Sequence, residues 1–273
     1  MTRHPGRGTI ASARLVRRAA LSGLFIALTA CTLSAQSIAR RVERVRDGTI
    51  RMSFASRPDV CGNGRNNIST HGSRGGSGRN RDEWLDECEN GPVRVAMDIA
   101  AGQLIAVRTY VAGRWGASAG ATDLGTVAVK EAVDFLLDNA ARGSGNGARD
   151  AIFPATIADS VEVWPRLLAI AKDEARERGV RTQAILWVSQ AAGEKATQGL
   201  AEVVGDAAAD QEVRLSAVFA LSQRRTDGVP ALLAIARTSK DPAIRKQAIF
   251  WLGQARDPRA LEYFESVLTR KQE

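Results

Sequence analysis

The sequence predicts a mainly α-helical protein: a stack of about four to five helix pairs, preceded by a small β region that carries a disulfide. Three observations support this fold class. A helical motif recurs with a nearly fixed period, a shorter region alternates polar and apolar residues, and two cysteines flank a Gly-rich segment. The expected organisation is a signal peptide over 1–30, a β region over 36–125 and a helical stack over 126–273.

The first thirty residues resemble an export signal. Several arginines precede an apolar run over 19–30, which is too short to span a bilayer core of about 30 Å. Residues 28–31, Leu-Thr-Ala-Cys, resemble a bacterial lipobox, which would make Cys31 the lipidated first residue; cleavage after Ala35 is the alternative. Either route predicts an exported protein, periplasmic or lipid-anchored in the cell envelope, that meets a membrane only through Cys31.

Strand signals follow in residues 36–125. A short charged linker leads to 49–55, which alternates like an edge strand. Residues 92–99 and 103–111 alternate on either side of a short Ala-Ala-Gly segment, as in a β-hairpin. We expect these segments to form a small sheet that is supported by the disulfide and by the first helix of the stack, because two or three strands alone are marginal.

Two cysteines are expected to pair. With Cys31 consumed or removed, Cys61 and Cys88 are an isolated pair, which favours a disulfide in an oxidising compartment. Their separation of 27 residues would stabilise the fold by about 3 kcal/mol. Between them, residues 62–81 are mostly Gly, Ser, Asn and Arg, and we expect a flexible loop because this segment buries little apolar surface.

From about Thr126 the pattern changes to a helical period. The motif Arg-Thr-Gln-Ala-Ile-Leu-Trp-Val-Ser-Gln starts at Arg181 and returns from Arg214 and Arg245, with a weaker copy from Ala148; the starts lie 33, 33 and 31 residues apart. Partner helices of matching phase alternate with the motif helices and are expected at 164–172, 196–204, 229–236 and 260–268.

Capping residues agree with these boundaries. Ser144, Glu177, Asp210 and Asp241 each stand four residues before a motif start, and Ser and Asp are favoured N-caps. Asp210 with Arg214, and Asp241 with Arg245, are also expected to form acid–base pairs within one helix.

The segment from Asp241 to Gly253, Asp-Pro-x-x-Arg-x-x-Ala-Ile-x-x-Leu-Gly, resembles a HEAT repeat, in the subtype also seen in phycobilisome lyases. The resemblance covers about residues 126–273 and implies a right-handed α-solenoid. It specifies the fold more than the function, because such repeats serve many roles. The first copy departs from the pattern, with Ala148 in place of Arg and Pro154 inside the helix, which predicts a cap or a bent unit.

A helical wheel separates the faces of the motif helix. Ala184, Ile185 and Val188 face the partner helix. A second apolar column lies elsewhere on the helix, and we expect it to be buried between neighbouring repeats. That column is Phe153, Leu186, Phe219 and Phe250.

The remaining columns contain the candidate binding residues. The resemblance implies that this helix lines the concave surface, and tryptophan is enriched in binding hot spots. The alternative is that both tryptophans pack at the seams between repeats. The candidates for a partner-binding surface are Trp187, Gln190, Gln223, Trp251 and Gln254.

Composition argues against a catalytic role and against nucleic-acid binding. The net charge is +8, but five arginines of the signal account for most of it, and residues 125–273 are neutral, whereas a nucleic-acid binder needs a basic stripe. Beyond the signal the only histidine is His71, in the Gly-rich loop, so we expect no catalytic residues, metal or cofactor. The sequence favours a non-catalytic scaffold that binds a protein partner in the bacterial cell envelope. The alternative is an accessory or lyase-type enzyme component built on HEAT-like repeats.

Overall fold

The computed structural model describes residues 37–65, 67–70, 88–116, 120–190, 194–224 and 227–270. All of them belong to one compact unit, Gln36–Glu273. The expected signal peptide over 1–30, Cys31 and His71 lie outside the described residues. Within the described part of the chain, no helix combines the length and the apolar character needed to cross a membrane.

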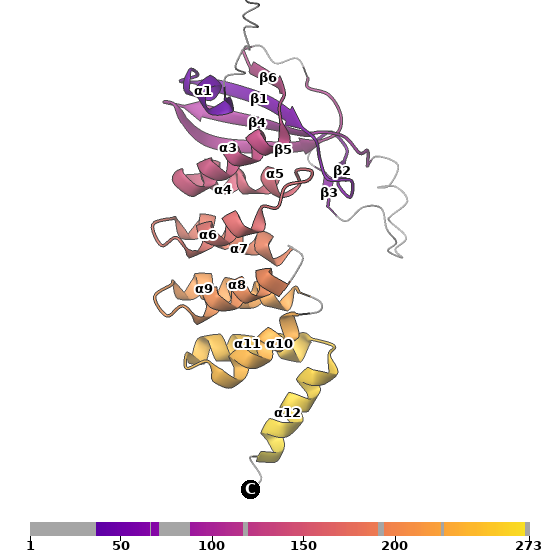
Figure 1. Ribbon diagram of the computed structural model, residues 1–273, viewed down its shortest axis with the longest axis vertical. Coiled ribbons are helices and arrows are strands. Elements are labelled where there is room, and N and C mark those ends of the chain that lie inside the picture. Colours follow the sequence, from indigo (N-terminus) through magenta and orange to yellow (C-terminus); the bar gives the residue numbers. More distant parts are fainter. Residues whose placement is uncertain are drawn as a thin grey trace, which may run out of the picture. The chain divides into compact units, whose positions relative to one another are not determined.

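A four-stranded sheet forms the β region (Figure 1). The strand order is β5-β4-β1-β6; β1 pairs antiparallel with β4 and parallel with β6, and β4 and β5 form an antiparallel hairpin. The bounds are β1 Gly48–Phe54, β4 Val93–Ala100, β5 Gln103–Val111 and β6 Thr122–Thr126. The predicted strand and hairpin are confirmed. The edge position expected for the first strand is wrong, because β6, whose only buried side chain is Leu124, adds beside it.

Helices cover the apolar face of this sheet. Helix α1, Ile38–Glu43, stands where a linker was expected, and it buries Ile38 and Val42 one turn apart. Its first backbone N–H, on Ile38, donates to Glu131 Oε1 at 2.7 Å, which ties α1 to α3, Val129–Arg142. The sheet, α1 and the repeats share one continuous hydrophobic core.

The predicted disulfide between Cys61 and Cys88 is present, with a Cα–Cα distance of 5.3 Å. The start of the Gly-rich segment is ordered rather than flexible, since β2, Cys61–Gly62, pairs with β3, Ile68–Ser69. Gly62 also exchanges backbone hydrogen bonds with Glu89, beside the disulfide. A covalent link and backbone pairing therefore order a segment that has little apolar surface to bury.

The rest of the chain is a stack of helix pairs (Figure 1). Each motif helix packs most extensively against the partner helix that precedes it, and the motif helices also pack on one another. Along the chain the elements are α3 with α4 Gly145–Asp150 and α5 Ile152–Thr156, α6 Trp164–Lys172 with α7 Arg178–Ser189, α8 Glu194–Gly205 with α9 Gln211–Ser222, α10 Gly228–Thr238 with α11 Pro242–Gln254, and finally α12 Pro258–Arg270.

An arginine at the start of the motif joins successive repeats. Arg181 Nη1 contacts Asp210 Oδ2 at 2.8 Å, and Arg214 Nη1 contacts Asp241 Oδ2 at 2.8 Å. The same arginines donate from Nε to backbone oxygens near the end of the preceding partner helix, at Ala171 and in α8. The acid–base pairs expected within one helix are therefore wrong: each of these aspartates pairs with the arginine of the previous repeat. Arg181 is only 2% exposed, so this contact lies inside the seam.

The degenerate first copy is a bent unit, as one of the two sequence interpretations expected. Its helix is interrupted at Ala151 into α4 and α5. Helix α4 packs against β5, and a Cβ built at Gly147 would lie 2.0 Å from the backbone oxygen of Leu104. Close approach to the sheet therefore explains why this copy differs from the others.

Candidate protein-binding surface

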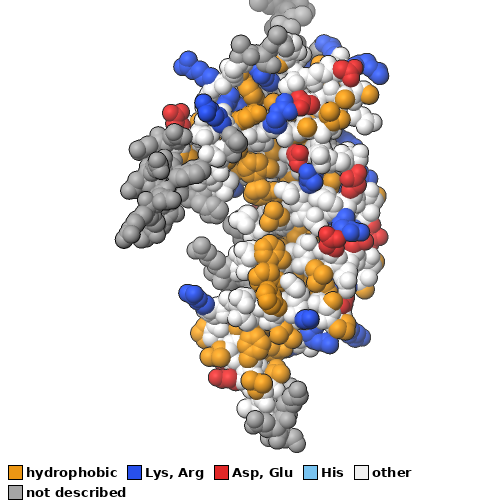
Figure 2. All heavy atoms as spheres, turned by 180° about the vertical axis from the view of Figure 1, so that it is seen from behind, with side chains coloured by type: hydrophobic (Ala, Val, Ile, Leu, Met, Phe, Trp, Pro, Cys, Tyr) orange, Lys and Arg blue, Asp and Glu red, His pale blue; other side chains and the backbone are white. Residues whose placement is uncertain are grey.

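The motif helices expose one row of large apolar side chains. Leu186, Phe219 and Phe250 hold the same position in α7, α9 and α11, and they are 40%, 37% and 52% exposed. We call these three residues the apolar row. In the space-filling view, hydrophobic side chains form a band that runs along the repeats (Figure 2). The expectation that this column is buried between repeats is wrong for these three residues.

Tryptophans fill the seams instead. Trp187 stacks on Phe153 of the previous repeat with ring centroids 4.9 Å apart, and Trp251 packs on Phe219 with centroids 5.1 Å apart. Aromatic pairs of this kind are worth about 0.5–1.5 kcal/mol beyond the area that they bury. Both indoles are half-buried, and neither Nε1 has a hydrogen-bond partner among the described residues. The tryptophans therefore support the row by packing, and a direct role in binding stays a prediction.

The middle seam carries smaller side chains. The positions equivalent to the two Phe–Trp stacks are occupied there by Leu186 and by Ala220, which is buried in α9. Side-chain volume along the row is therefore uneven, with an aromatic stack on either side of an aliphatic position. Such an uneven apolar surface can distinguish partners by the sizes of their side chains, because packing at interfaces depends on shape complementarity.

Glutamines lie beside the row. Gln190, Gln223 and Gln254 are exposed at the C-terminal ends of α7, α9 and α11. Gln190 donates to Ser189 Oγ at 3.2 Å and Gln223 to Ser222 Oγ at 3.1 Å, which orients these two amides. A side-chain amide both donates and accepts hydrogen bonds, so this column matches the backbone of a bound polypeptide segment.

A pocket of about 420 Å³ lies next to Trp187 and Gln190. Its charged groups already have hydrogen-bond partners, since Arg57 contacts Asp59 at 3.2 Å and Glu162 accepts from the neutral indole of Trp164 at 2.5 Å. A pocket with internally paired charges suits a neutral side chain better than an ion. It adds a mixed polar and apolar recess beside Trp187.

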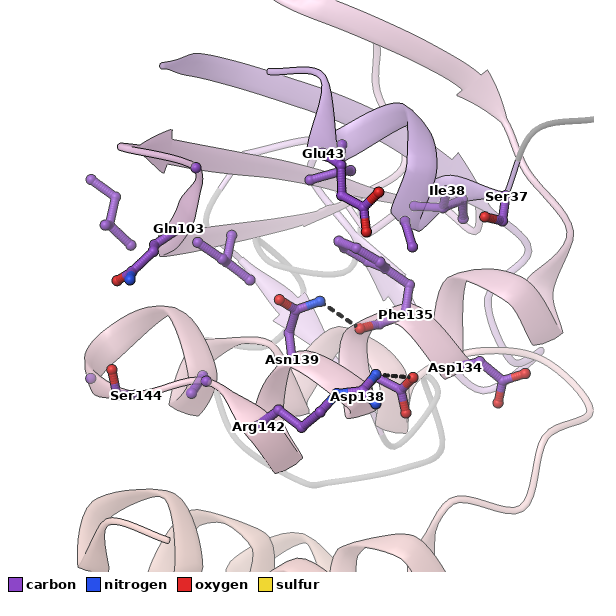
Figure 3. Close-up of a pocket in the computed structure, with 18 of the residues that line it drawn as sticks. Ser37, Ile38, Glu43, Gln103, Asp134, Phe135, Asp138, Asn139, Arg142 and Ser144 are labelled. Carbon is purple, nitrogen blue, oxygen red and sulfur yellow. Dashed lines mark hydrogen bonds and ion pairs between the residues drawn. The ribbon is translucent and has the colours of Figure 1, made fainter. Parts of the chain in front are cut away.

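A larger pocket of about 800 Å³ lies between α1, the β4–β5 turn, α3 and α4 (Figure 3). Three of its four acids are held in structural contacts: Asp134 pairs with Lys130 and Arg166, Asp138 pairs with Arg142 and Arg166, and Glu131 accepts from the backbone N–H of Ile38. Figure 3 shows the Asp138–Arg142 pair and the Asn139 amide donating to the backbone oxygen of Phe135. Carboxylates paired in this way are poor candidates for general acid–base work.

Two acids with lowered pKa values also lie away from the apolar row. A hydrogen bond from Arg108 lowers the pKa of Asp98. The pKa of Asp227 is lowered as well, because hydrogen bonds from Thr197 and Arg224 outweigh the effect of burial, which acts in the opposite direction. No group of three or more His, Cys, Asp or Glu residues in the described ranges could hold a metal ion. The apolar row itself consists of neutral side chains.

Comparison with known proteins supports the family resemblance. The HEAT repeats family matches residues 206–273, which span α9 to α12. No curated protein matches the chain. The matched segment contains Phe219 and Phe250 of the apolar row, and Leu186 lies outside it.

The sequence identified the helices that carry these side chains but placed the column of Leu186, Phe219 and Phe250 in the interior, whereas these three residues are exposed. The binding role expected for the tryptophans and glutamines stays a prediction. A signal for the exposure of this second column was present: Ala184, Ile185 and Val188 already satisfy the partner-helix face, and all three are buried. The second apolar column, which contains Leu186, Phe219 and Phe250, could therefore be buried only if another element covered it. The spacing of the repeats alone does not show whether the next helix covers it.

Proposed function

We propose that the chain is a non-catalytic protein-interaction module of the bacterial cell envelope that binds a protein partner along the apolar row. The observation that carries this proposal is the exposure of a large apolar side chain at the same position of three successive motif helices. Monomeric soluble proteins rarely expose contiguous apolar patches larger than a few hundred Å², and such patches often mark interaction sites. HEAT repeats commonly serve as scaffolds for such contacts, which agrees with the proposal.

The chemistry of the surface describes the partner. The row offers apolar contact, the neighbouring glutamines offer neutral hydrogen bonds, and the adjoining pocket accepts a neutral side chain. These features suit a polypeptide segment that presents apolar side chains at intervals and has free backbone amides between them. Charge contributes little, since the row contains no ionisable side chain.

The finer features of the family belong to the same proposal. We infer a right-handed winding of the stack, as in HEAT-type solenoids, and an architecture of the phycobilisome-lyase subtype without its chemistry. Export follows from the signal-like residues 1–30 and agrees with the Cys61–Cys88 disulfide, which an oxidising compartment would maintain. The mature protein is then either free in the periplasm or anchored through a lipid on Cys31.

Row variants test the binding surface. Leu186→Gln and Phe250→Gln replace exposed apolar groups with a polar group, and Ile105→Gln is the matched control because Ile105 is 51% exposed on β5, outside the row. Cross-linking pull-downs from intact envelopes are expected to lose a partner in both row variants and to keep it in the control. Unchanged capture by both row variants, with melting temperatures equal to that of the native chain, would contradict the proposal.

The mature N-terminus tests export separately. Intact-mass measurement is expected to find a chain that begins at Gln36 or at a lipidated Cys31. A protein that retains residues 1–30 in the cell would refute the proposed localisation and would leave the binding surface itself unaffected.

A further inference from the structure

A second site lies on the sheet face that the helices leave uncovered, apart from the apolar row. Arg51 of β1, Ala96 of β4 and Arg108 of β5 stand opposite one another in the strand register, and Arg94 lies two residues before Ala96. Alternate residues of a strand point to the same face, so these arginines share one side of the sheet. With Arg114 they line a pocket of about 270 Å³, which we call the arginine pocket.

Arg94 is fixed in place by backbone contacts. Its side chain donates from Nε to the oxygen of Ala112 at 2.7 Å and from Nη2 to the oxygen of Gly64 at 2.8 Å, and it is only 4% exposed. The two segments that hold it approach closely at Gly64 and Gly113, where a Cβ on Gly113 would lie 2.8 Å from the Cα of Gly64. Nη1 of Arg94 has no hydrogen-bond partner among the described residues.

Two of the guanidinium groups contact the same indole. The Cζ atoms of Arg51 and Arg94 each lie 4.8 Å from the ring centroid of Trp115. Arg51 also donates to the backbone oxygen of Gly116 at 3.1 Å, while its Nε is buried without a partner in the described part of the chain. Stacking on the aromatic ring stabilises both cations but leaves their charge uncompensated.

The pocket has an excess of positive charge. None of its lining residues is acidic. The nearby Asp98 is occupied by Arg108 and by the hydroxyl of Thr49, which donates at 2.8 Å. Among the residues that the structure describes, Arg51, Arg94 and Arg114 form no ion pair, so these three guanidinium groups have no counterion there. Burial lowers the pKa of Arg94, and the like charge of Arg51 acts in the same direction.

We propose that the arginine pocket binds the phosphoryl group of a small ligand. Guanidinium groups match phosphate oxygens with paired hydrogen bonds, and a doubly charged anion neutralises three cations better than a single carboxylate does. The volume suits a phosphomonoester headgroup or a small free phosphate compound. A nucleic-acid backbone would need a row of such contacts, whereas these arginines converge on one pocket.

Calorimetry with the purified chain tests the site. Inorganic phosphate and pyrophosphate are the free probes, and vesicles of phosphatidylcholine with or without phosphatidic acid are the membrane probes. We expect saturable binding that weakens at least about tenfold in Arg51→Gln and in Arg114→Gln, since each removes a charge-assisted hydrogen bond. Arg256→Gln is the matched control, because this exposed arginine lies outside the pocket, and it is expected to bind like the native chain.

The free probes and the membrane probes together distinguish the source of the phosphoryl group. Binding of the free probes alone indicates a soluble ligand, and binding of phosphatidic acid vesicles in competition with pyrophosphate indicates a lipid headgroup. The proposal is overturned if neither kind of probe binds, if citrate binds at least as well as pyrophosphate, or if the control variant loses as much affinity as the two pocket variants. Because the two sites share no residue, none of these outcomes bears on the apolar row.

Discussion

Replacing Gly147 with alanine should destabilise the contact between the sheet and the first repeat. Gly147 is a buried residue of α4, and a Cβ at this position would lie 2.0 Å from the backbone oxygen of Leu104 and 2.6 Å from its carbonyl carbon. Ordinary van der Waals contact begins at 3.4 Å, so the two backbones would have to separate by more than an ångström. Leu104 cannot move freely, because it pairs with Ile99 in the β4–β5 hairpin.

The expected cost follows from two opposing effects. Overpacking of a tight contact costs about 1–3 kcal/mol, and more where backbone must move. Alanine in a helix recovers about 0.5–1 kcal/mol relative to glycine. We therefore expect a net loss towards the upper end of roughly 0–2.5 kcal/mol, or a fall of up to about 10 °C in melting temperature for a chain of this size.

A second glycine supplies the matched control. Gly179 lies in the first turn of α7 with no neighbouring atom within 4 Å of a built Cβ, so Gly179→Ala should stabilise the protein by about 0.5–1 kcal/mol. Urea unfolding followed by circular dichroism gives both values, and hydrogen exchange reports whether protection falls in α4 and the β4–β5 hairpin. If Gly147→Ala is as stable as Gly179→Ala, the close packing of α4 on the sheet is refuted.

Three further predictions concern the contacts that hold the fold. Hydrogen bonds from the Arg259 side chain and backbone lower the pKa of Asp257 to about 2. This carboxylate therefore stabilises the fold above about pH 4 and loses that effect as the pH falls towards 2. The urea midpoints at pH 5 and pH 2 should differ less in Asp257→Asn than in the native chain. Asp241 accepts capping hydrogen bonds from Ala243 and Ile244 and also pairs with Arg214, so Asp241→Ala should lower the midpoint of urea unfolding. Asp210→Ala, which removes an ion pair without a capping bond, should cost less; an equal loss would argue against the cap. Reduction of the Cys61–Cys88 disulfide should lower the unfolding free energy by about 3 kcal/mol, and an unchanged midpoint in dithiothreitol would contradict its contribution.

Local patterns in the sequence predicted the helices of the repeats and three strands of the sheet, β1, β4 and β5. The motif helices, their partner helices, the first strand, the hairpin and the disulfide all lie where periodicity and cysteine spacing placed them. These features depend on residues close together in the chain. Helix α1 and strand β6 were missed because each is short and contains few apolar residues, so that tertiary contacts determine its structure.

Contacts between repeats were harder to predict. The sequence placed Arg214 opposite Asp210 of its own helix, yet the arginine reaches Asp241 of the next repeat, because its stem runs along the seam. The apolar row was assigned to the interior for the same reason: periodicity identifies an apolar face but does not specify which element covers it. The arginine pocket was also missed, since Arg51, Arg94 and Arg114 are distant in sequence and meet only through the register of the sheet and the loop after β5.

Site-specific photo-cross-linking tests the central claim most directly. A photoreactive amino acid placed at position 186, 219 or 250 samples the apolar row, and one at position 105 samples an equally exposed apolar site outside it. If the apolar row is the binding surface, the three row positions form an adduct with the same protein partner in intact envelopes, and position 105 does not. Adducts of equal yield at position 105, or none at any row position, would contradict it.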